Sequence, residues 1–125
     1  MIKGLQETER ELERRNISFA AFLGNPEEKI PELIKKHSIS TLIRDFSPLN
    51  IITKWNKSIS QNISIPFIEV DTRNIIPAWI TSDKEEYAAR TIRPKIHKLL
   101  PEYLVEFPKI KKPWLTGTSF PQNEM

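Results

Sequence analysis

The apolar residues of this chain alternate between helical spacing and short, nearly continuous runs. Ile2, Leu5 and Leu12 lie near one stripe, so residues 1–16 are predicted to form an amphipathic helix. Residues 17–23 are then almost entirely apolar and end at a Gly-Asn pair, a pattern typical of a strand covered on both faces. The opening of the chain therefore predicts a helix followed by a strand of a parallel sheet.

A second helix is predicted to begin at Asn25. Asn25 can serve as an N-cap, Pro26 suits the first helical position, and two acids follow. Pro31 removes a backbone donor, so we expect a kink or a restart there. His37 is expected to close this helix.

The alternation of helix and strand then continues. Residues 39–44 and 65–70 predict two more short strands, and Asp45 and Asp71 follow them directly. Pro48 is expected to open the helix between them, with a buried stripe formed by Ile51, Ile52, Trp55 and Ile59. Short connections between such elements are typical of a Rossmann-like, doubly wound parallel sheet of α/β class, here incomplete, with about three strands and flanking helices.

The pattern changes after the third predicted strand. Residues 72–81 are apolar but contain Pro77, which predicts an extended segment that packs rather than pairs. Residues 82–85 resemble a capping box that opens a last helix, bent at Pro94 and stopped at Pro101.

We therefore expect residues 1–107 to form a single α/β domain, because a chain of 125 residues encloses one core. Residues 108–125 lack periodicity and are expected to be a linker or a disordered tail.

Composition narrows the functional classes. Nineteen Lys and Arg against 16 Asp and Glu give a formal charge of +3, which neither demands nor excludes a nucleic-acid partner. The absence of cysteine excludes a disulfide framework, a thiolate zinc site and a cysteine nucleophile, and it favours the cytoplasm. The first fifteen residues are highly charged and resemble neither a signal peptide nor a membrane span, so no membrane partner is expected.

Candidate chemistry is sparse. The three glycines stand singly, which excludes a phosphate-binding loop, and His37 and His97 lack the spacing of a metal site. Asp45 and Asp71 fall at predicted strand carboxyl ends, where open α/β sheets bind ligands. An aspartate there can equally cap the following turn, and position alone leaves both interpretations open.

The predicted last helix is basic. Lys84, Arg90, Arg93 and Lys95 could contact a phosphate backbone. A solvated helix face or intramolecular salt bridges would give the same pattern, and we favour those.

Residues 82–96, Ser-Asp-Lys-Glu-Glu-Tyr-Ala-Ala-Arg-Thr-Ile-Arg-Pro-Lys-Ile, resemble the stretch that closes the amino-terminal domain of class II cyclobutane pyrimidine dimer DNA photolyases. The resemblance extends to about Pro113. Further landmarks follow in the family's order: Gly4-Leu5-Gln6-Glu7, Leu23-Gly24-Asn25-Pro26, Asp45-Phe46-Ser47-Pro48-Leu49, Val70-Asp71 and Ile76-Pro77-Ala78-Trp79.

This resemblance implies light-driven repair of ultraviolet-damaged DNA, in which reduced FAD donates an electron to a pyrimidine dimer. In the family, a helical carboxyl-terminal domain holds the flavin and the flipped-out dimer, while the amino-terminal domain borders an antenna pigment, a deazaflavin or a folate. The resemblance assigns Asp45, Phe46, Ser47, Pro48 and Leu49 to the loop nearest the antenna cleft. Asn50 stands where the family usually has a basic residue, which puts that side chain's contact in doubt.

The resemblance also implies a part of a larger domain. The family's sheet has five strands in the order 3-2-1-4-5, and this chain is expected to begin at the helix before strand three, without the two central strands and without the FAD domain. We therefore expect a fragment of a deoxyribodipyrimidine photolyase, a carbon–carbon lyase by family, that contains no catalytic residues. Alone, it is expected to hold no cofactor, FAD included, and to repair no dimers. Trp55, Trp79 and Trp114 would then be structural rather than electron carriers.

The first predicted strand would lack its neighbour in such a piece. We expect closure into three parallel strands in chain order, with self-association through unpaired strand edges as a risk. Two other interpretations remain: a stand-alone α/β module that binds a small ligand beside Asp45 and Asp71, and, ranked last, a blue-light receptor of the cryptochrome group.

Overall fold

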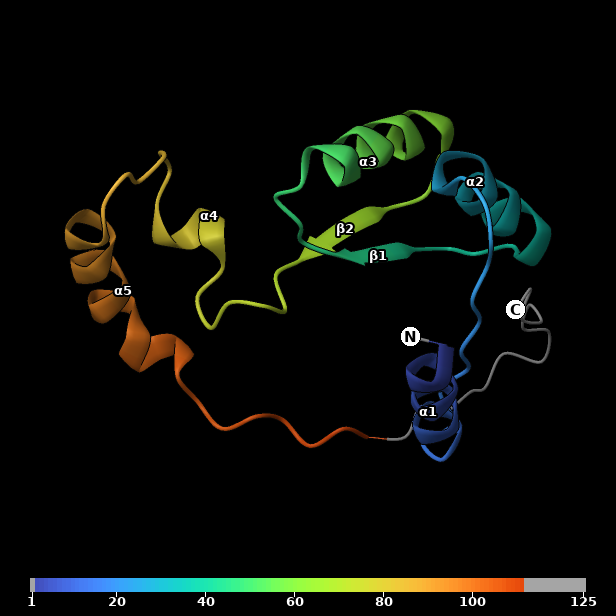
Figure 1. Ribbon diagram of the computed structural model, residues 1–125, viewed down its shortest axis with the longest axis horizontal. Helices are drawn as coiled ribbons and strands as arrows, with labels where there is room; N and C mark the ends of the chain where they lie inside the picture. Colours follow the sequence, from blue (N-terminus) through green and yellow to red (C-terminus); the bar gives the residue numbers. More distant parts are fainter. Residues whose placement is uncertain (1, 112–125) are drawn as a thin grey trace.

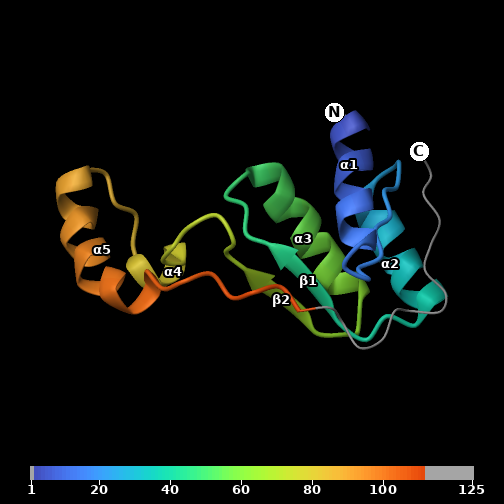
Figure 2. The same ribbon diagram turned by 90° about the horizontal axis from the view of Figure 1, so that it is seen from below.

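The computed structural model describes residues 2–111, so Trp114 and most of the predicted tail lie outside the described residues. The elements, in chain order, are α1 (Ile2–Glu13), α2 (Pro26–His37), β1 (Leu42–Asp45), α3 (Asn50–Asn62), β2 (Phe67–Val70), α4 (Ala78–Thr81) and α5 (Ala89–Tyr103). Figures 1 and 2 show α2 and α3 grouped with the sheet, and α4 and α5 grouped at the other end of the molecule. The chain is thus a mixed α/β structure.

The sheet consists of β1 and β2, which run parallel and are joined by α3. Leu42 lies opposite Phe67, and Asp45 lies opposite Val70. Arg44 forms an ion pair with its register partner Glu69, and its guanidinium lies 5.7 Å from the centre of the Phe67 ring. The two strands are thus held together by an ion pair and a cation–π contact on one face of the sheet, in addition to their backbone hydrogen bonds.

The prediction of a strand at residues 17–23 was wrong, because the structure has no strand there. Within residues 2–111 the sheet has the two-stranded order β1-β2, so the expected three strands and their closure in chain order are not found. Ile17, Phe19 and Phe22 are only half-buried. An apolar run indicates that a segment is buried on two faces. To form a strand, the segment must also pair in register with the free edge of a neighbouring strand. The composition of the run does not show whether such an edge is available.

The second helix was predicted correctly from its cap. The Asn25 side chain accepts a hydrogen bond from the Glu27 amide at 3.2 Å, and Pro26 occupies the first helical position. The helix is continuous through Pro31, so the restart offered as one expectation there was wrong, and it ends at His37, as expected. Ser38 follows with φ of 50°, and its amide donates to the Ile34 carbonyl, which satisfies a free carbonyl at the helix end.

The last two helices differ from the prediction. Residues 72–81 are not extended throughout, because Pro77 starts the single turn of α4. Ile76 nevertheless packs as expected, with 6% of its surface exposed. The capping box at residues 82–85 opens no helix, since α5 begins at Ala89 and runs past Pro101 to Tyr103.

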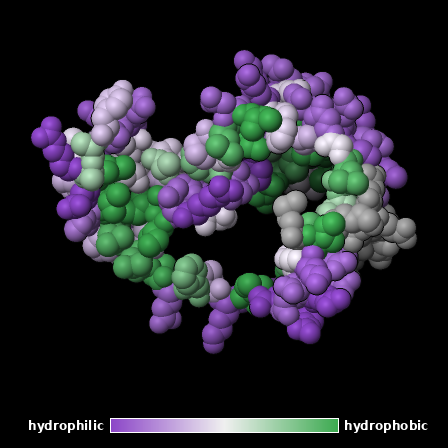
Figure 3. All heavy atoms as spheres, viewed as in Figure 1, coloured by the Kyte–Doolittle hydropathy of each residue, from purple (hydrophilic) through white to green (hydrophobic). Residues whose placement is uncertain are grey.

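The core is small. Its buried apolar residues in the described chain are Ile34 on α2, Ile59 on α3 and Ile76 before α4. The predicted stripe of α3 was partly wrong, because Ile51 is 53% exposed while Ile59 is 2% exposed. Apolar surface remains around the central opening seen in Figure 3. None of the helices among residues 2–111 is long and apolar enough to cross a bilayer.

Candidate functional site

The loop of residues 46–49, between β1 and α3, is fixed at both ends. The Phe46 amide extends the ladder by donating to the Val70 carbonyl at 2.8 Å. The Leu49 carbonyl accepts from the Thr53 amide at 3.0 Å and from the Thr53 hydroxyl at 3.3 Å. Leu49 and Pro48 remain exposed and Ser47 is half-buried, so the loop presents an apolar tip to solvent.

Asp45 joins the end of β1 to the segment that follows β2. Its Oδ1 accepts from the Thr72 amide at 3.1 Å and from the Thr72 hydroxyl at 2.8 Å, and its Oδ2 accepts from Arg73 Nε at 3.1 Å. Hydrogen bonds from the Thr72 backbone and side chain, with a smaller contribution from Arg73, hold the pKa of Asp45 below its ordinary value. The carboxylate therefore stays ionised and holds two strand ends together.

Asp71 has a structural role. It is buried and accepts from the amides of Arg73, Asn74 and Ala78, each at 3.1 Å, and from the Asn74 side chain at 2.8 Å. Burial raises the pKa of Asp71, but hydrogen bonds from Asn74 and Ala78 outweigh burial and leave the pKa lowered. Asp71 therefore caps the turn that follows β2, which was one of the two interpretations of its position. Its carboxylate oxygens already accept these hydrogen bonds, so little acceptor capacity remains for a ligand.

An aromatic contact links the loop to α4. The rings of Phe46 and Trp79 meet edge to face, with centroids 5.6 Å apart and planes at 77°. Trp79 is 47% exposed, so its other surface faces solvent. The structure thus places an exposed aromatic beside the predicted loop, a neighbour that spacing in the sequence alone did not indicate.

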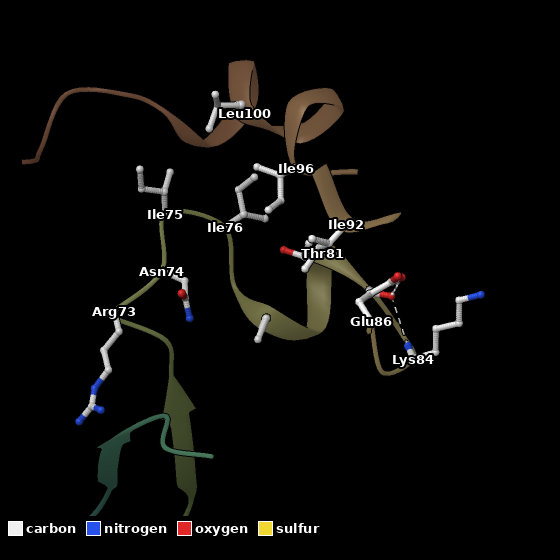
Figure 4. Close-up of a pocket in the computed structure, with 12 residues that line it drawn as sticks. Arg73, Asn74, Ile75, Ile76, Thr81, Lys84, Glu86, Ile92, Ile96 and Leu100 are labelled. Carbon is white, nitrogen blue, oxygen red and sulfur yellow. Dashed lines mark hydrogen bonds between the residues drawn. The ribbon is translucent and has the colours of Figure 1, made fainter. Parts of the chain in front are cut away.

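A hollow of about 460 Å³ opens between the segment after β2, α4 and α5. This size lies within the usual range for small-molecule sites. Figure 4 shows apolar side chains along α5 facing the segment before α4, with Arg73 and Lys84 at opposite sides. The lining residues are Arg73, Asn74, Ile75, Ile76, Ala78, Thr81, Ser82, Lys84, Glu86, Ile92, Ile96 and Leu100. Sequence reasoning missed this hollow because its walls come from segments whose contact depends on the tertiary fold.

A half-buried ion pair closes one side of the hollow. Glu86 Oε1 lies 2.6 Å from Lys95 Nζ, and the Glu86 side chain is only 8% exposed. The Ser82 hydroxyl donates to Glu86 at 2.9 Å and accepts from Lys95 at 2.8 Å. The hydrogen bond from Lys95, followed by those from Thr91 and Ser82, lowers the pKa of Glu86 to about 2. Ser82 therefore serves this cluster, which explains why it does not cap a helix.

The two histidines occupy different elements. His37 ends α2, and His97 is exposed on α5. Among the described residues, no group of three or more His, Cys, Asp or Glu side chains could hold a metal ion.

Comparison with known proteins assigns the chain to a family. Residues 1–113 match the DNA photolyase family model. The chain is 44% identical over 112 residues to the deoxyribodipyrimidine photo-lyase of Potorous tridactylus, a match covering 88% of this chain and 21% of that protein. It is 41% identical over 115 residues to the Arabidopsis thaliana deoxyribodipyrimidine photo-lyase, covering 90% and 23%, and 35% identical over 121 residues to the Oryza sativa subsp. japonica protein of that name, covering 91% and 24%.

The chain therefore spans about a fifth to a quarter of the length of these relatives. The family match covers nearly all of the chain, and the similarity is well above the level at which only a fold is shared. The chain belongs to the DNA photolyase family.

Proposed function

We propose that this chain is the antenna-side part of the amino-terminal α/β domain of a class II deoxyribodipyrimidine photolyase, and that it serves light-driven repair of pyrimidine dimers in DNA. The observation that carries the proposal is the family match over residues 1–113, together with 44% identity to a deoxyribodipyrimidine photo-lyase. In this proposal, FAD and the damaged bases bind to the part of a photolyase that this chain does not match. The enzyme acts in the cytoplasm in this proposal.

The loop from Asp45 to Leu49 is the proposed edge of the antenna cleft. Its apolar tip and the exposed ring of Trp79 suit the flat face of an aromatic pigment, because stacked rings gain dispersion and electrostatic energy at close range. The hydrogen bonds of Asp45 to Thr72 and Arg73 hold this surface in place before a pigment arrives. Less conformational freedom is then lost on binding.

The stand-alone module that binds a ligand between Asp45 and Asp71 is not favoured. Asp71 is buried and already accepts several hydrogen bonds from the segment that follows it. A ligand at that position would have to replace those contacts.

Pigment binding tests the proposed role of the loop. The chain is titrated into a deazaflavin and, separately, into a folate, and pigment fluorescence anisotropy is measured. The sequence alone led us to expect no cofactor in the isolated chain, but the fixed loop and the exposed Trp79 ring support binding of one of the two pigments. Leu49→Asp should weaken that binding by about tenfold or more, because a charge would be buried against the pigment. Leu104→Asp is the matched control, since Leu104 is also exposed and lies after α5. Equal loss in both variants, or no binding of either pigment, would count against the loop.

A further inference from the structure

The positive charge of the chain is concentrated on α5. Residues 89–103 contain four Lys or Arg and one Glu, which leaves 15 of the 19 cationic residues and 15 of the 16 acidic residues for the rest of the chain. The formal charge of +3 therefore equals the charge of this helix. Such a one-sided distribution is typical of a protein that meets a polyanion.

The cations of α5 divide into two groups. Lys95 is paired with the half-buried Glu86 and belongs to the fold. Arg90, Arg93 and Lys98 are exposed, and within residues 2–111 they have no hydrogen-bonded or ion-paired acidic partner. The intramolecular salt bridges expected for this helix thus account for Lys95 and leave the other three cations unused.

The exposed cations lie outside the apolar stripe of α5. At about 100° per residue, Arg90 and Arg93 are about 60° apart with the exposed His97 between them, and Lys98 lies about 80° from Arg90 on its other side. Ile92, Ile96 and Leu100 face the hollow, and Arg93 borders their stripe next to Leu100. A rise of about 1.5 Å per residue spreads Arg90 to Lys98 over roughly 12 Å, enough to meet successive phosphates of one strand.

The stability of α5 does not explain why a cation such as Arg90 lies near its amino terminus. The first turn of α5 contains no acid, and its N-cap residue Ala88 makes no side-chain hydrogen bond. Positive side chains are unfavourable near a helix amino terminus because the helix dipole is positive there. Arg90 therefore weakens the helix slightly, which is the expected cost of a residue that serves an external contact.

We propose that the exposed face of α5 contacts the phosphate backbone of DNA through Arg90, Arg93 and Lys98. The inference rests on the proposed function for the identity of the polyanion, and it adds a contact from this part of the protein to those of the flavin-bearing part. Phosphate contacts of this kind position a protein on DNA without reading its sequence. Arginine suits them because its planar guanidinium donates two parallel hydrogen bonds to a phosphate.

The test is binding of the chain to a short fluorescent duplex, measured by anisotropy from about 25 to about 150 mM salt. We expect weak, salt-dependent binding. The double variant R90Q/R93Q should bind more weakly at low salt and should reduce the slope of log affinity against log salt by about two, one for each lost phosphate contact. Glutamine retains helix propensity, and circular dichroism checks that α5 persists.

A matched control separates a local contact from overall charge. K54Q/K57Q removes the same charge from two exposed positions three residues apart on α3, and it should leave the affinity and slope nearly unchanged. Equal losses in the two double variants would overturn the proposal, as would the absence of duplex binding at low salt. Poly-glutamate that competes as well as duplex, charge for charge, would also overturn it by pointing to an acidic protein surface.

These outcomes are distinct from those of the pigment titration. A chain that binds a pigment through Leu49 but shows no effect of R90Q/R93Q would retain the proposed function and lose only the DNA contact.

Discussion

Phe46 and Trp79 meet edge to face at 5.6 Å and thereby connect the loop after β1 to α4. The contact joins the two ends of the molecule seen in Figure 1, since Phe46 directly follows β1 and Trp79 belongs to the α4 turn beside α5. Aromatic pairs of this geometry contribute about 0.5–1.5 kcal/mol beyond the surface that they bury. The position of the loop of residues 46–49 relative to α4 thus depends in part on one pair of rings.

Trp79→Ala should lower the free energy of unfolding by about 1–2 kcal/mol, because it removes the ring contact and part of a half-exposed side chain. Urea unfolding and near-ultraviolet circular dichroism measure the change. Ile80→Ala is the control, since Ile80 is similarly exposed in the same turn and has no aromatic partner among the described residues. Equal destabilisation by the two variants would mean that the ring contact adds nothing.

Ile59→Ala should be more damaging, at about 2–5 kcal/mol, because Ile59 is 2% exposed and helps to form a small core. Ile51→Ala, on the same helix, removes a side chain that is 53% exposed and should change stability by less than about 0.5 kcal/mol. Chemical denaturation of both variants gives the comparison. Similar losses at the two positions would contradict the packing of α3 described above.

Glu86 should give the chain an acid-sensitive stability. Its folded-state pKa of about 2 lies below the ordinary value of 4.5, so the stabilisation is complete above about pH 4.5 and is lost as the pH falls toward 2. Glu86→Gln should lower the urea midpoint at about pH 6 and should reduce its further fall by about pH 3. Asp45 and Asp71, whose pKa values are also lowered, should keep part of the slope.

Glu102→Gln, at an exposed position on α5, is the control for this experiment. A pH dependence that is the same in Glu86→Gln and in the unmodified chain would show that the pair with Lys95 does not stabilise the fold.

Local signals in the sequence were sufficient for some elements. The start of α2 was predictable because Asn25 and Pro26 act within one turn of helix. The parallel pairing of β1 and β2 followed from two short apolar runs separated by a helix of suitable length. The general position of Asp45 at a strand end was likewise predictable, although its partners Thr72 and Arg73 were not.

Tertiary contacts determined the rest. Residues 17–23 have a strand-like composition, but pairing requires an edge in register, which composition does not specify. Ser82 has the local pattern of a helix cap, yet its hydroxyl contacts Glu86 and Lys95, a residue thirteen positions away. The hollow beside α5 depends on that same cluster and could not be predicted from spacing.

We propose that these residues perform the work of the corresponding part of a photolyase. The most direct measurement replaces the matched segment of the Potorous tridactylus deoxyribodipyrimidine photo-lyase, 44% identical to this chain, with the matching residues of this chain. Repair of dimer-containing DNA by the purified chimera is then compared in light and in darkness. We predict repair that depends on light. A folded chimera that holds its flavin and yet repairs no dimers in light would contradict the account.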